Sequence, residues 1–352
     1  MTVLDSGGVS TSSTDEGRPT DKVVDVLIVG AGPVGLYGAY YAGVRGLSVG
    51  VVDSLSQVGG QVSAMYPEKQ IYDVGGFASI LGRDLVAGLF EQAASAHPTY
   101  LLDQEAQTLD RREDGRLRVV TSTGNVVDCG AVVVTGGIGT FSPRQLPAGE
   151  DFLGRGLEYF VTDIEGYAGR DVLIVGGGDS AFDWCQMLEP LASTVTLVHR
   201  RERFRAQAGT VEKVRDSSVR IITNAEVAAL SGDGTVQGAA VAVRGEPAPL
   251  DVVCQRVVAA LGFKASLGPM REWGVQMHDN RHLVVDSAMR TNLPGVFGAG
   301  DVVEYDGKVR LIATGFGEVA TAVNNAAVHI DPEAHLFPGH TSEMPRPASA
   351  PA

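Results

Sequence analysis

The chain has 352 residues, 44% of them hydrophobic, and its 42 acidic against 28 basic residues give a formal net charge of -14. A single hydrophobic core rarely grows past roughly 250 to 300 residues, so this length predicts two domains. The acidic balance argues against a nucleic-acid-binding protein, because neutralising phosphates requires clustered lysines and arginines.

Residues 1–20 are polar and small, and they lack the basic start and apolar core of a secretory signal. This composition is typical of a disordered leader. No apolar run in the sequence approaches the roughly 20 residues that a membrane helix needs. We therefore expect a cytoplasmic protein without a membrane span.

Residues 25–54 carry a first nucleotide-binding pattern. The apolar run DVLIV is typical of a strand buried on both faces, and Gly30-x-Gly32-x-x-Gly35 and a helix-like segment follow it. In this motif the glycines permit a tight turn, the approach of a pyrophosphate and close helix packing. Asp53 comes 23 residues after Gly30, where a ribose-binding carboxylate is expected. The residues that we assign to this dinucleotide site are Gly30, Gly32, Pro33, Gly35 and Asp53.

Residues 171–201 repeat the pattern. The apolar run is followed by Gly176-x-Gly178-x-x-Ala181, and His199 comes 23 residues after Gly176, at the position that Asp53 holds in the first copy. The loop and helix start that we assign to a second dinucleotide are Gly176, Gly178, Asp179, Ser180 and Ala181.

The stretch HRRERFRA, residues 199–206, has four arginines in six positions. Taken alone, such a charge run is usually a solvated helix face. At the position of a ribose-binding carboxylate, however, it favours the 2' phosphate of NADP, because the planar, permanently charged guanidinium binds phosphate bidentately. We assign this role to His199, Arg200, Arg201 and Arg205. An acid in one copy and cations in the other predict two different dinucleotides, FAD in the first and NADPH in the second.

Later segments complete the two units. The runs AVVVTGG (131–137) and RVVAALGF (256–263) each predict a buried strand that ends in small residues. A short strand then leads into Gly300 and Asp301, which are well placed for the ribityl or pyrophosphate part of a flavin, and residues 312–330 predict a helix. We therefore expect an α/β chain of two Rossmann-like, three-layer domains, the first interrupted by the second. The expected ranges are 21–137 with 268–342 for FAD, 138–267 for NADPH, and 343–352 for a flexible tail.

Several of these motifs are recognisable together. The paired glycine loops, HRRERFRA and the late GVFGAGD resemble the two-domain flavoprotein class that includes low-molecular-weight thioredoxin reductase. Within that class, GGQVSAMYPEKQIYDVGGF (59–77), GGGDSAFDW, LIATGFGEVATAVNNA and PGHTS resemble the thioredoxin-reductase-like ferredoxin:NADP+ reductases. The resemblance extends over roughly residues 21–342.

One expected motif of thioredoxin reductases is missing. Their redox CxxC would fall where this chain has LEYFVTDIEGY, which contains no cysteine. Dithiol exchange needs a thiolate and a resolving partner, so that chemistry is not expected here. The three cysteines, Cys129, Cys185 and Cys254, are far apart in sequence and offer neither a disulfide framework nor a metal-binding spacing. We interpret them as buried small hydrophobic residues.

The resemblance implies roles for further residues. Gln61 would contact the flavin, Tyr66 would stack on its ring, and Asp73 would lie near the ring, although Tyr66 could be a core aromatic residue and Asp73 a turn residue. Ala106 would offer backbone contacts to the adenine. Phe141 would lie against the cofactor, with a plain linker residue as the alternative. In the C-terminal segment, the residues that would cover the other flavin face, either of their own chain or of a partner subunit in a homodimer, are His340, Thr341 and Ser342.

The implied activity is hydride transfer from NADPH to FAD, followed by single-electron transfer to ferredoxin or flavodoxin. It requires neither a nucleophilic residue nor a metal, since the cofactor carries the chemistry. The alternatives are a flavin-dependent reductase with another acceptor and a non-catalytic NADPH or flavin sensor. An acidic electron carrier would dock on a local basic patch, for which the candidates are Lys69, Arg83, Lys264 and Arg290.

Overall fold

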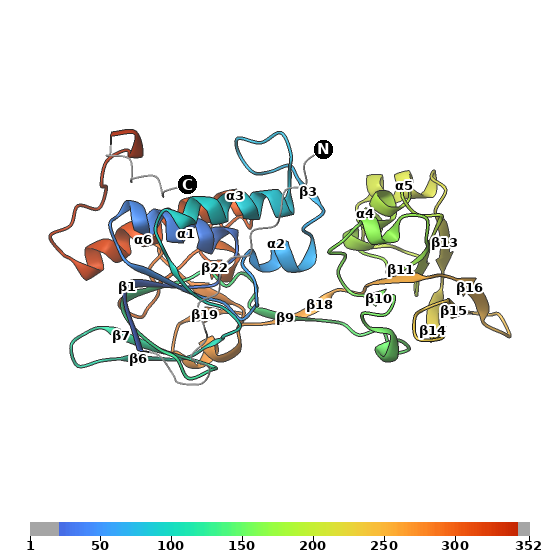
Figure 1. Ribbon diagram of the computed structural model, residues 1–352, viewed down its shortest axis with the longest axis horizontal. Coiled ribbons are helices and arrows are strands. Elements are labelled where there is room, and N and C mark those ends of the chain that lie inside the picture. The colour runs from blue at the N-terminus through green and yellow to red at the C-terminus, as the bar shows by residue number, and fades with distance from the viewer. Residues whose placement is uncertain (1–20, 344–352) are drawn as a thin grey trace, which may run out of the picture.

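The computed structural model describes residues 21–343, and these form two bodies side by side (Figure 1). The chain crosses between the bodies twice, at β9 (Thr140–Pro143) and β18 (Phe263–Ser266), which pair antiparallel with each other. Because the two crossings share one small sheet, the connection is a narrow two-stranded ribbon.

The first body is built on a sheet of order β5-β2-β1-β8-β7-β6, with β21 also paired to β8. The pairs β5-β2, β2-β1, β1-β8 and β8-β21 are parallel, whereas β6, β7 and β8 form an antiparallel meander. The strands of this sheet are β1 (Asp21–Val29), β2 (Val49–Val52), β5 (Thr99–Leu101), β6 (Ala106–Arg111), β7 (Leu117–Thr121), β8 (Val126–Val134) and β21 (Val296–Gly298).

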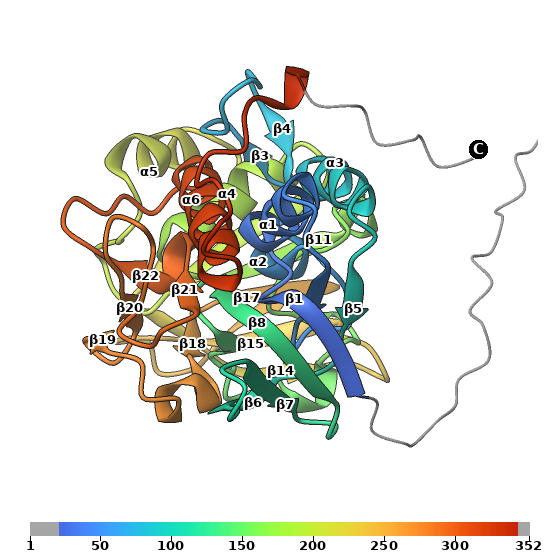
Figure 2. The same cartoon turned by 90° about the vertical axis from the view of Figure 1, so that its left-hand side faces the viewer.

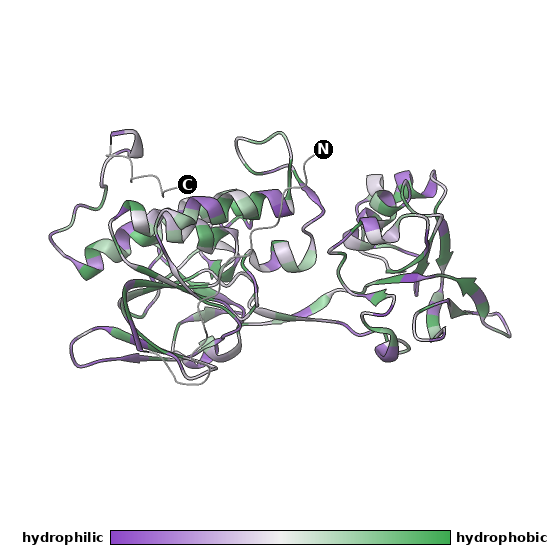
Figure 3. Cartoon of the chain, in the orientation of Figure 1, coloured by the Kyte–Doolittle hydropathy of each residue, from purple (hydrophilic) through white to green (hydrophobic). Residues whose placement is uncertain are grey.

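Three helices cover one face of this sheet, and the β6-β7 meander lies on the other side (Figures 1 and 2). The helices are α1 (Pro33–Val44), α3 (Gly82–Ala94) and α6 (Ile312–Ile330). The helix predicted over 312–330 therefore matches α6. The parallel strands are hydrophobic, and α3 and α6 carry both hydrophobic and hydrophilic residues (Figure 3), whereas α1 has no charged residue. This difference is expected, because central parallel strands are covered on both faces and a surface helix on only one.

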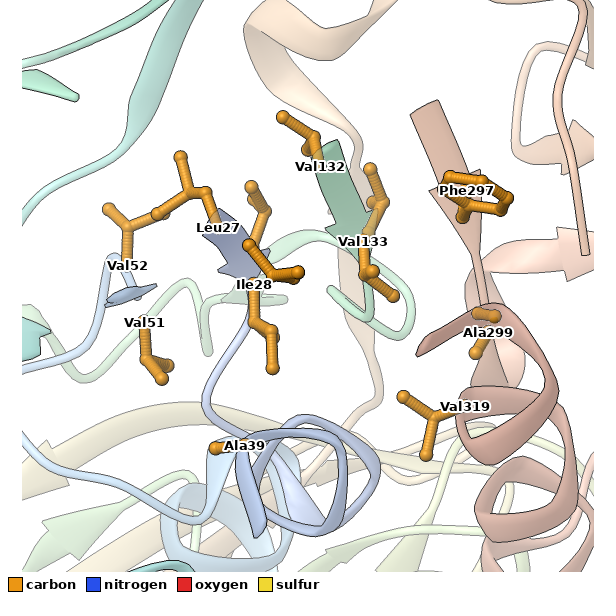
Figure 4. Packing of buried hydrophobic residues seen from close by; sticks show 14 of the residues in the cluster. Leu27, Ile28, Ala39, Val51, Val52, Val132, Val133, Phe297, Ala299 and Val319 are labelled. Atoms are coloured by element: carbon orange, nitrogen blue, oxygen red, sulfur yellow. The ribbon is translucent and has the colours of Figure 1, made fainter. Parts of the chain in front are cut away.

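The core of the first body draws on segments that are far apart in the sequence. Leu27 and Ile28 of β1 pack with Val132 and Val133 of β8, and Val319 of α6 closes the layer (Figure 4). All five side chains are fully buried. Residues near both ends of the described chain thus share one core, and the segment between them forms the second body.

The second body is a parallel sheet of order β10-β17-β11-β12-β13. One hydrophobic cluster lies between this sheet and its two helices, and a second cluster lies between it and a three-stranded antiparallel sheet. The elements are β10 (Leu157–Glu158), β11 (Asp171–Gly176), α4 (Asp179–Leu188), β12 (Thr194–His199), α5 (Ala208–Arg215), β13 (Arg220–Thr223), β14 (Ala225–Ser231), β15 (Gly238–Val243), β16 (Leu250–Val253) and β17 (Arg256–Ala260).

Short elements decorate both bodies. The helix and strands among them are α2 (Gly60–Met65), β3 (Gln70–Ile71), β4 (Ile80–Leu81), β19 (Met277–His278), β20 (His282–Val284) and β22 (Val303–Glu304). The 3₁₀ turns are η1 (Glu150–Phe152), η2 (Glu165–Tyr167), η3 (Gly268–Glu272), η4 (Gly300–Val302) and η5 (Thr341–Glu343).

The predicted fold class, α/β with two three-layer Rossmann-like units, is confirmed. The leader expected over 1–20 lies outside the described residues, and so does all but the first residue of the tail expected over 343–352, since Glu343 ends η5. Among the helices of residues 21–343, none is long and apolar enough to cross a bilayer.

Candidate functional site

The first glycine loop follows β1 and leads into α1. Gly30 has a φ of +117°, and a Cβ placed there would lie 2.7 Å from the backbone of Thr135 at the end of β8. A Cβ on Gly35 would overlap the carbonyl oxygen of Gly30. Gly32, in contrast, is the N-cap of α1, and a Cβ there would have no atom nearer than 4.0 Å. Two glycines are thus required by the protein itself, whereas Gly32 leaves room for a ligand at the positive end of the helix.

Asp53 lies beside this loop, directly after β2. Its carboxylate accepts hydrogen bonds from Ala31 N at 2.6 Å and Leu55 N at 2.8 Å. Burial raises the pKa of Asp53, and the two backbone N–H groups partly offset that rise. The carboxylate therefore braces the glycine loop and still faces the adjoining pocket, with lone pairs free for a hydroxyl donor.

A pocket of about 330 Å³ extends from the glycine loop toward the linker strands. Residues from eight separate stretches of sequence line it, so this body's loops converge here. The predicted residues that line it are Gly30, Gly32, Pro33, Asp53, Gln61, Tyr66, Ala106, Phe141, Gly300 and Asp301. The lining residues that we did not predict include Leu55, Gln104, Glu105, Thr135, Thr140, Leu267, Met270 and Ile312.

At one end of the pocket, Tyr66 is mostly buried. Burial, together with the carboxylates of Asp301 and Asp73, raises the pKa of Tyr66 to about 12. The phenol therefore stays protonated, and its hydroxyl remains a hydrogen-bond donor, throughout the physiological range. Phe141 lies on the linker strand β9 and also lines the pocket, so it is both a linker residue and a pocket residue. Its ring packs edge-on against that of Phe160, with 6.0 Å between the ring centroids.

Gly300 and Asp301 are held by a buried polar cluster that the sequence did not indicate. Glu318 of α6 accepts a hydrogen bond from Gly300 N at 2.7 Å and another from the Tyr305 hydroxyl at 2.7 Å. Lys308 forms an ion pair with the same carboxylate, and the two side chains are 0% and 4% exposed. Burial raises the pKa of Asp301, while nearby Lys308 lowers it. The cluster fixes the turn that carries Asp301 into the pocket.

Some predicted residues do not reach the pocket. Asp73 lies in the exposed β3–β4 loop, close enough to affect Tyr66 but outside the pocket lining. The segment that includes His340, Thr341 and Ser342 follows α6 and passes the end of α1, where Arg45 donates a hydrogen bond of 2.8 Å to the carbonyl of His335. Within one chain, the structure therefore does not bring the C-terminal residues to this pocket.

The second glycine loop repeats the geometry of the first. A Cβ on Gly176 would lie 2.5 Å from the carbonyl oxygen of Ala260 on the neighbouring strand, whereas Gly178, the N-cap of α4, has open space around it. Ala181 is fully buried where the first copy has Gly35. Ser180 is exposed in the first turn of α4, at the open end of the loop. This loop has the same backbone cradle for an anion at a helix N-terminus.

The residues after β12 form a basic loop fastened to this cradle. Arg205 N donates to the carbonyl of Gly177 at 2.7 Å, and Gln207 N donates to Asp179 Oδ1 at 2.9 Å. Asp179 therefore anchors the loop with its carboxylate. The ring of His199 lies against Gly177 and 5.4 Å from the ring of Phe204, so it is a packing element of the loop.

Three arginine charges of the basic loop act on the imidazole of His199. Burial lowers the pKa of His199, and the positive charges of Arg200, Arg201 and Arg205 lower it further. Arg203 acts on the imidazole only through a backbone hydrogen bond, so its charge does not add to this effect. All four arginines are exposed, and none forms an ion pair within residues 21–343. Three unpaired cations gathered beside an anion cradle are suited to a phosphate group.

The cysteines are buried, as predicted. Burial raises the pKa of Cys129, Cys185 and Cys254 to about 12 each, so none supplies a thiolate near neutral pH. In the described part of the chain, no three His, Cys, Asp or Glu side chains group closely enough to hold a metal ion.

The four candidates for a basic docking patch do not form one exposed cluster. Arg83 pairs with Glu68 at 2.7 Å, and Arg290 donates to Asn325 of α6, whereas Lys264 lies on the linker strand β18. Lys69 pairs with Asp183 of the second body, and only 20% of its side chain is exposed. Lys69 therefore makes a contact between the two bodies.

Comparison with known proteins agrees with this geometry. The family described as pyridine nucleotide-disulphide oxidoreductase matches residues 24–326. A protein of Nocardioides sp. named ferredoxin--NADP reductase is 61% identical over 330 residues, which cover 92% of this chain and 99% of that protein. A protein of the same name from Salinispora arenicola is 62% identical over 322 residues, with coverages of 92% and 99%.

Among solved structures, thioredoxin reductase from T. acidophilum superimposes with a TM-score of 0.70 at 25% identity, covering 87% of this chain and 98% of that chain. Thioredoxin reductase from Lactococcus lactis gives a TM-score of 0.70 at 22% identity, with coverages of 87% and 99%, and so shares the fold. The chain belongs to the pyridine nucleotide-disulphide oxidoreductase family, and within it to the group of proteins named ferredoxin--NADP reductase.

Proposed function

We propose that this protein is an FAD-dependent ferredoxin:NADP+ reductase, which takes a hydride from NADPH and passes electrons one at a time to ferredoxin or flavodoxin. One observation carries the proposal: at equivalent strand ends, the first body presents the carboxylate of Asp53 and the second presents a cluster of unpaired arginines. A carboxylate binds the free hydroxyls of a ribose and repels a 2' phosphate, whereas guanidinium groups bind that phosphate. The names of the relatives point to the same nucleotide.

The residues of the first body fit FAD. The open space at Gly32 admits a pyrophosphate at the N-terminus of α1, Asp53 is placed for a ribose, and Ala106 is the first residue of β6 at the pocket wall. Asp301, which follows the Gly300 N–H held by Glu318, would accept hydrogen bonds from the hydroxyls of the ribityl chain. The residues that would hold this cofactor are those that we assigned to the first site and that line the pocket.

The second body would hold NADPH. The cradle at Gly176–Ala181 binds the pyrophosphate, and Arg200, Arg201 and Arg205 bind the 2' phosphate. His199 sets the shape of the loop through its packing on Gly177. Bound phosphate would offset the arginine charges and thereby raise the pKa of His199.

Bound FAD supplies the chemistry that accepts a hydride and releases electrons singly. The protein positions and shields the site. Tyr66 and Phe141 form aromatic walls of the pocket, and the Tyr66 hydroxyl holds its proton because its pKa is about 12. No thiolate is available near neutral pH, since the three cysteines are buried, so electrons would leave directly to an external carrier.

We further propose a homodimer in the cytoplasm. The C-terminal residues His340, Thr341 and Ser342 lie away from the pocket of their own chain, in keeping with a role at the flavin of a second copy. Three free cysteines are typical of a protein from a reducing compartment. Light scattering coupled to gel filtration would report twice the mass of 36.8 kDa for such a dimer.

The activity is tested with purified protein under anaerobic conditions. The proposal expects bound flavin, bleaching of its visible absorption by NADPH but far less by NADH, and NADPH-driven reduction of ferredoxin or flavodoxin. A panel of thioredoxins tested in parallel should not be reduced. Flavin-free protein that cannot be reconstituted, or reduction of a quinone or of oxygen in preference to ferredoxin and flavodoxin, would overturn the proposal.

A further inference from the structure

One ion pair joins the two bodies. Lys69 Nζ, in the loop after α2, lies 2.8 Å from Asp183 Oδ2 on α4, and it also lies over the ring of Trp184 at 5.0 Å from the centroid. Within residues 21–343, no other ion pair connects the bodies. The covalent connection between the bodies is the narrow ribbon of β9 and β18, along which no helix runs (Figure 1).

Each partner lies in an element that also forms part of a proposed cofactor site. Lys69 N donates to the carbonyl of Tyr66 at 3.1 Å, so the lysine belongs to the same turn as a wall of the flavin pocket. Asp183 lies on α4, one helical turn after Asp179, which begins the helix at the second glycine loop. The pair therefore links a wall of the first site to the helix that forms the second.

We propose that Lys69 and Asp183 are positioning residues, which hold the NADPH-binding helix against the flavin pocket in the orientation that favours hydride transfer. The inference rests on the proposed function for its kinetic consequence but not for its structural one. Trp184 is almost fully buried and gives the lysine a fixed aromatic surface beside its carboxylate partner.

The strength of this contact suits a reversible connection. The side chains of Lys69 and Asp183 are 20% and 40% exposed, so water and salt weaken their attraction. Exposed pairs of this kind change a two-state population by about two- to fivefold. The bodies would thus favour one orientation without being locked in it.

The structural test measures the distance between the bodies by pulsed electron paramagnetic resonance. Spin labels go on exposed cysteines introduced by Gln92→Cys in α3 and Lys213→Cys in α5, and the three native cysteines are buried and stay unlabelled. Lys69→Met and Asp183→Asn should each broaden the distance distribution. The reversed pair, Lys69→Glu with Asp183→Lys, should narrow it again.

The chain offers a matched control. Arg256 pairs with Glu158 at 3.3 Å and lies 5.8 Å from the ring centroid of Tyr167, so it makes the same two kinds of contact entirely within the second body. Arg256→Met should leave the distance distribution unchanged. Equal broadening in this variant, or no broadening in either Lys69→Met or Asp183→Asn, would overturn the inference.

The kinetic test follows flavin reduction by NADPH in a stopped-flow instrument. Lys69→Met and Asp183→Asn should slow reduction by about two- to fivefold, whereas the Kd for NADP+ should stay the same, because neither side chain belongs to the nucleotide cradle. At saturating NADPH, high salt should slow flavin reduction in the unmodified protein and not in these variants. Faster reduction, or a loss of NADP+ affinity that accounts for the slower rate, would contradict a positioning role. If the unmodified protein were not reduced by NADPH at all, the proposed function would fail while the distance measurement still decided the inference.

Discussion

Replacing Arg200 and Arg201 together with alanine probes the charge reversal between the two nucleotide sites. The guanidiniums of both residues are exposed and unpaired, and their charges reach His199 together with that of Arg205. A hydrogen bond to a charged group contributes about 1.5–3 kcal/mol. Because Arg200 and Arg201 are exposed to solvent, their hydrogen bonds to the phosphate should lie near or below the lower end of that range. Because Arg205 remains, we expect a total loss of about 1.4–2.8 kcal/mol, which raises the KM for NADPH about 10- to 100-fold.

Steady-state reduction of an artificial acceptor, with NADPH and NADH compared side by side, measures this effect. The KM for NADH should change little, since NADH lacks the 2' phosphate. Arg203→Ala is the matched control, because it removes the same charge from the same loop, and Arg203 acts on the His199 ring through its backbone rather than through that charge.

A second readout does not depend on activity. The arginines help hold the pKa of His199 below its ordinary value, so the double variant should raise that pKa, which NMR titration of the imidazole detects. Equal losses of affinity for NADPH and NADH, or an equal effect of Arg203→Ala, would refute the phosphate assignment.

The packing leads to three more expectations. Gly35→Ala should lower the free energy of unfolding in urea by about 1–3 kcal/mol, since its Cβ would overlap Gly30 O. Gly32→Ala should keep its stability and lose FAD affinity in a flavin-binding titration. Loss of stability in Gly32→Ala with loss of FAD affinity alone in Gly35→Ala would contradict the assigned roles. Glu318→Ala strands the buried charge of Lys308 and should lower the free energy of unfolding by about 3–5 kcal/mol, with a smaller loss when Lys308→Met is added; equal losses would argue against the pair. A thiol reagent such as N-ethylmaleimide should neither inhibit the native enzyme nor modify it until it is unfolded, because burial raises the pKa of every cysteine to about 12; rapid inactivation would point to thiol chemistry instead.

The local motifs determined much of the interpretation. A glycine needed for a tight turn, a helix that starts beside it and a polar residue at the next strand end are all coded within about 30 residues. For this reason the two loops, Asp53 and the arginine cluster could be identified from the sequence alone. The hydrophobic strands and the helix over 312–330 followed from the same local patterns.

Contacts between distant segments could not be predicted in this way. Nothing near Glu318 in the sequence indicates that its carboxylate would hold Gly300 N and pair with a fully buried lysine. From the sequence, Lys69 was a candidate for an exposed docking patch. Only the packing of α4 beside the flavin loop makes it a connection between the bodies.

The sequence by itself therefore determined the fold class, the two cradles and the sign of the charge at each, because backbone turns and strand ends depend on neighbouring residues. The tertiary structure alone decided which loops meet in the pocket, which charges are buried and how one body is held against the other. Those features arise from pairs such as Lys69 and Asp183, 114 positions apart, whose energies exist only once the chain has brought them together.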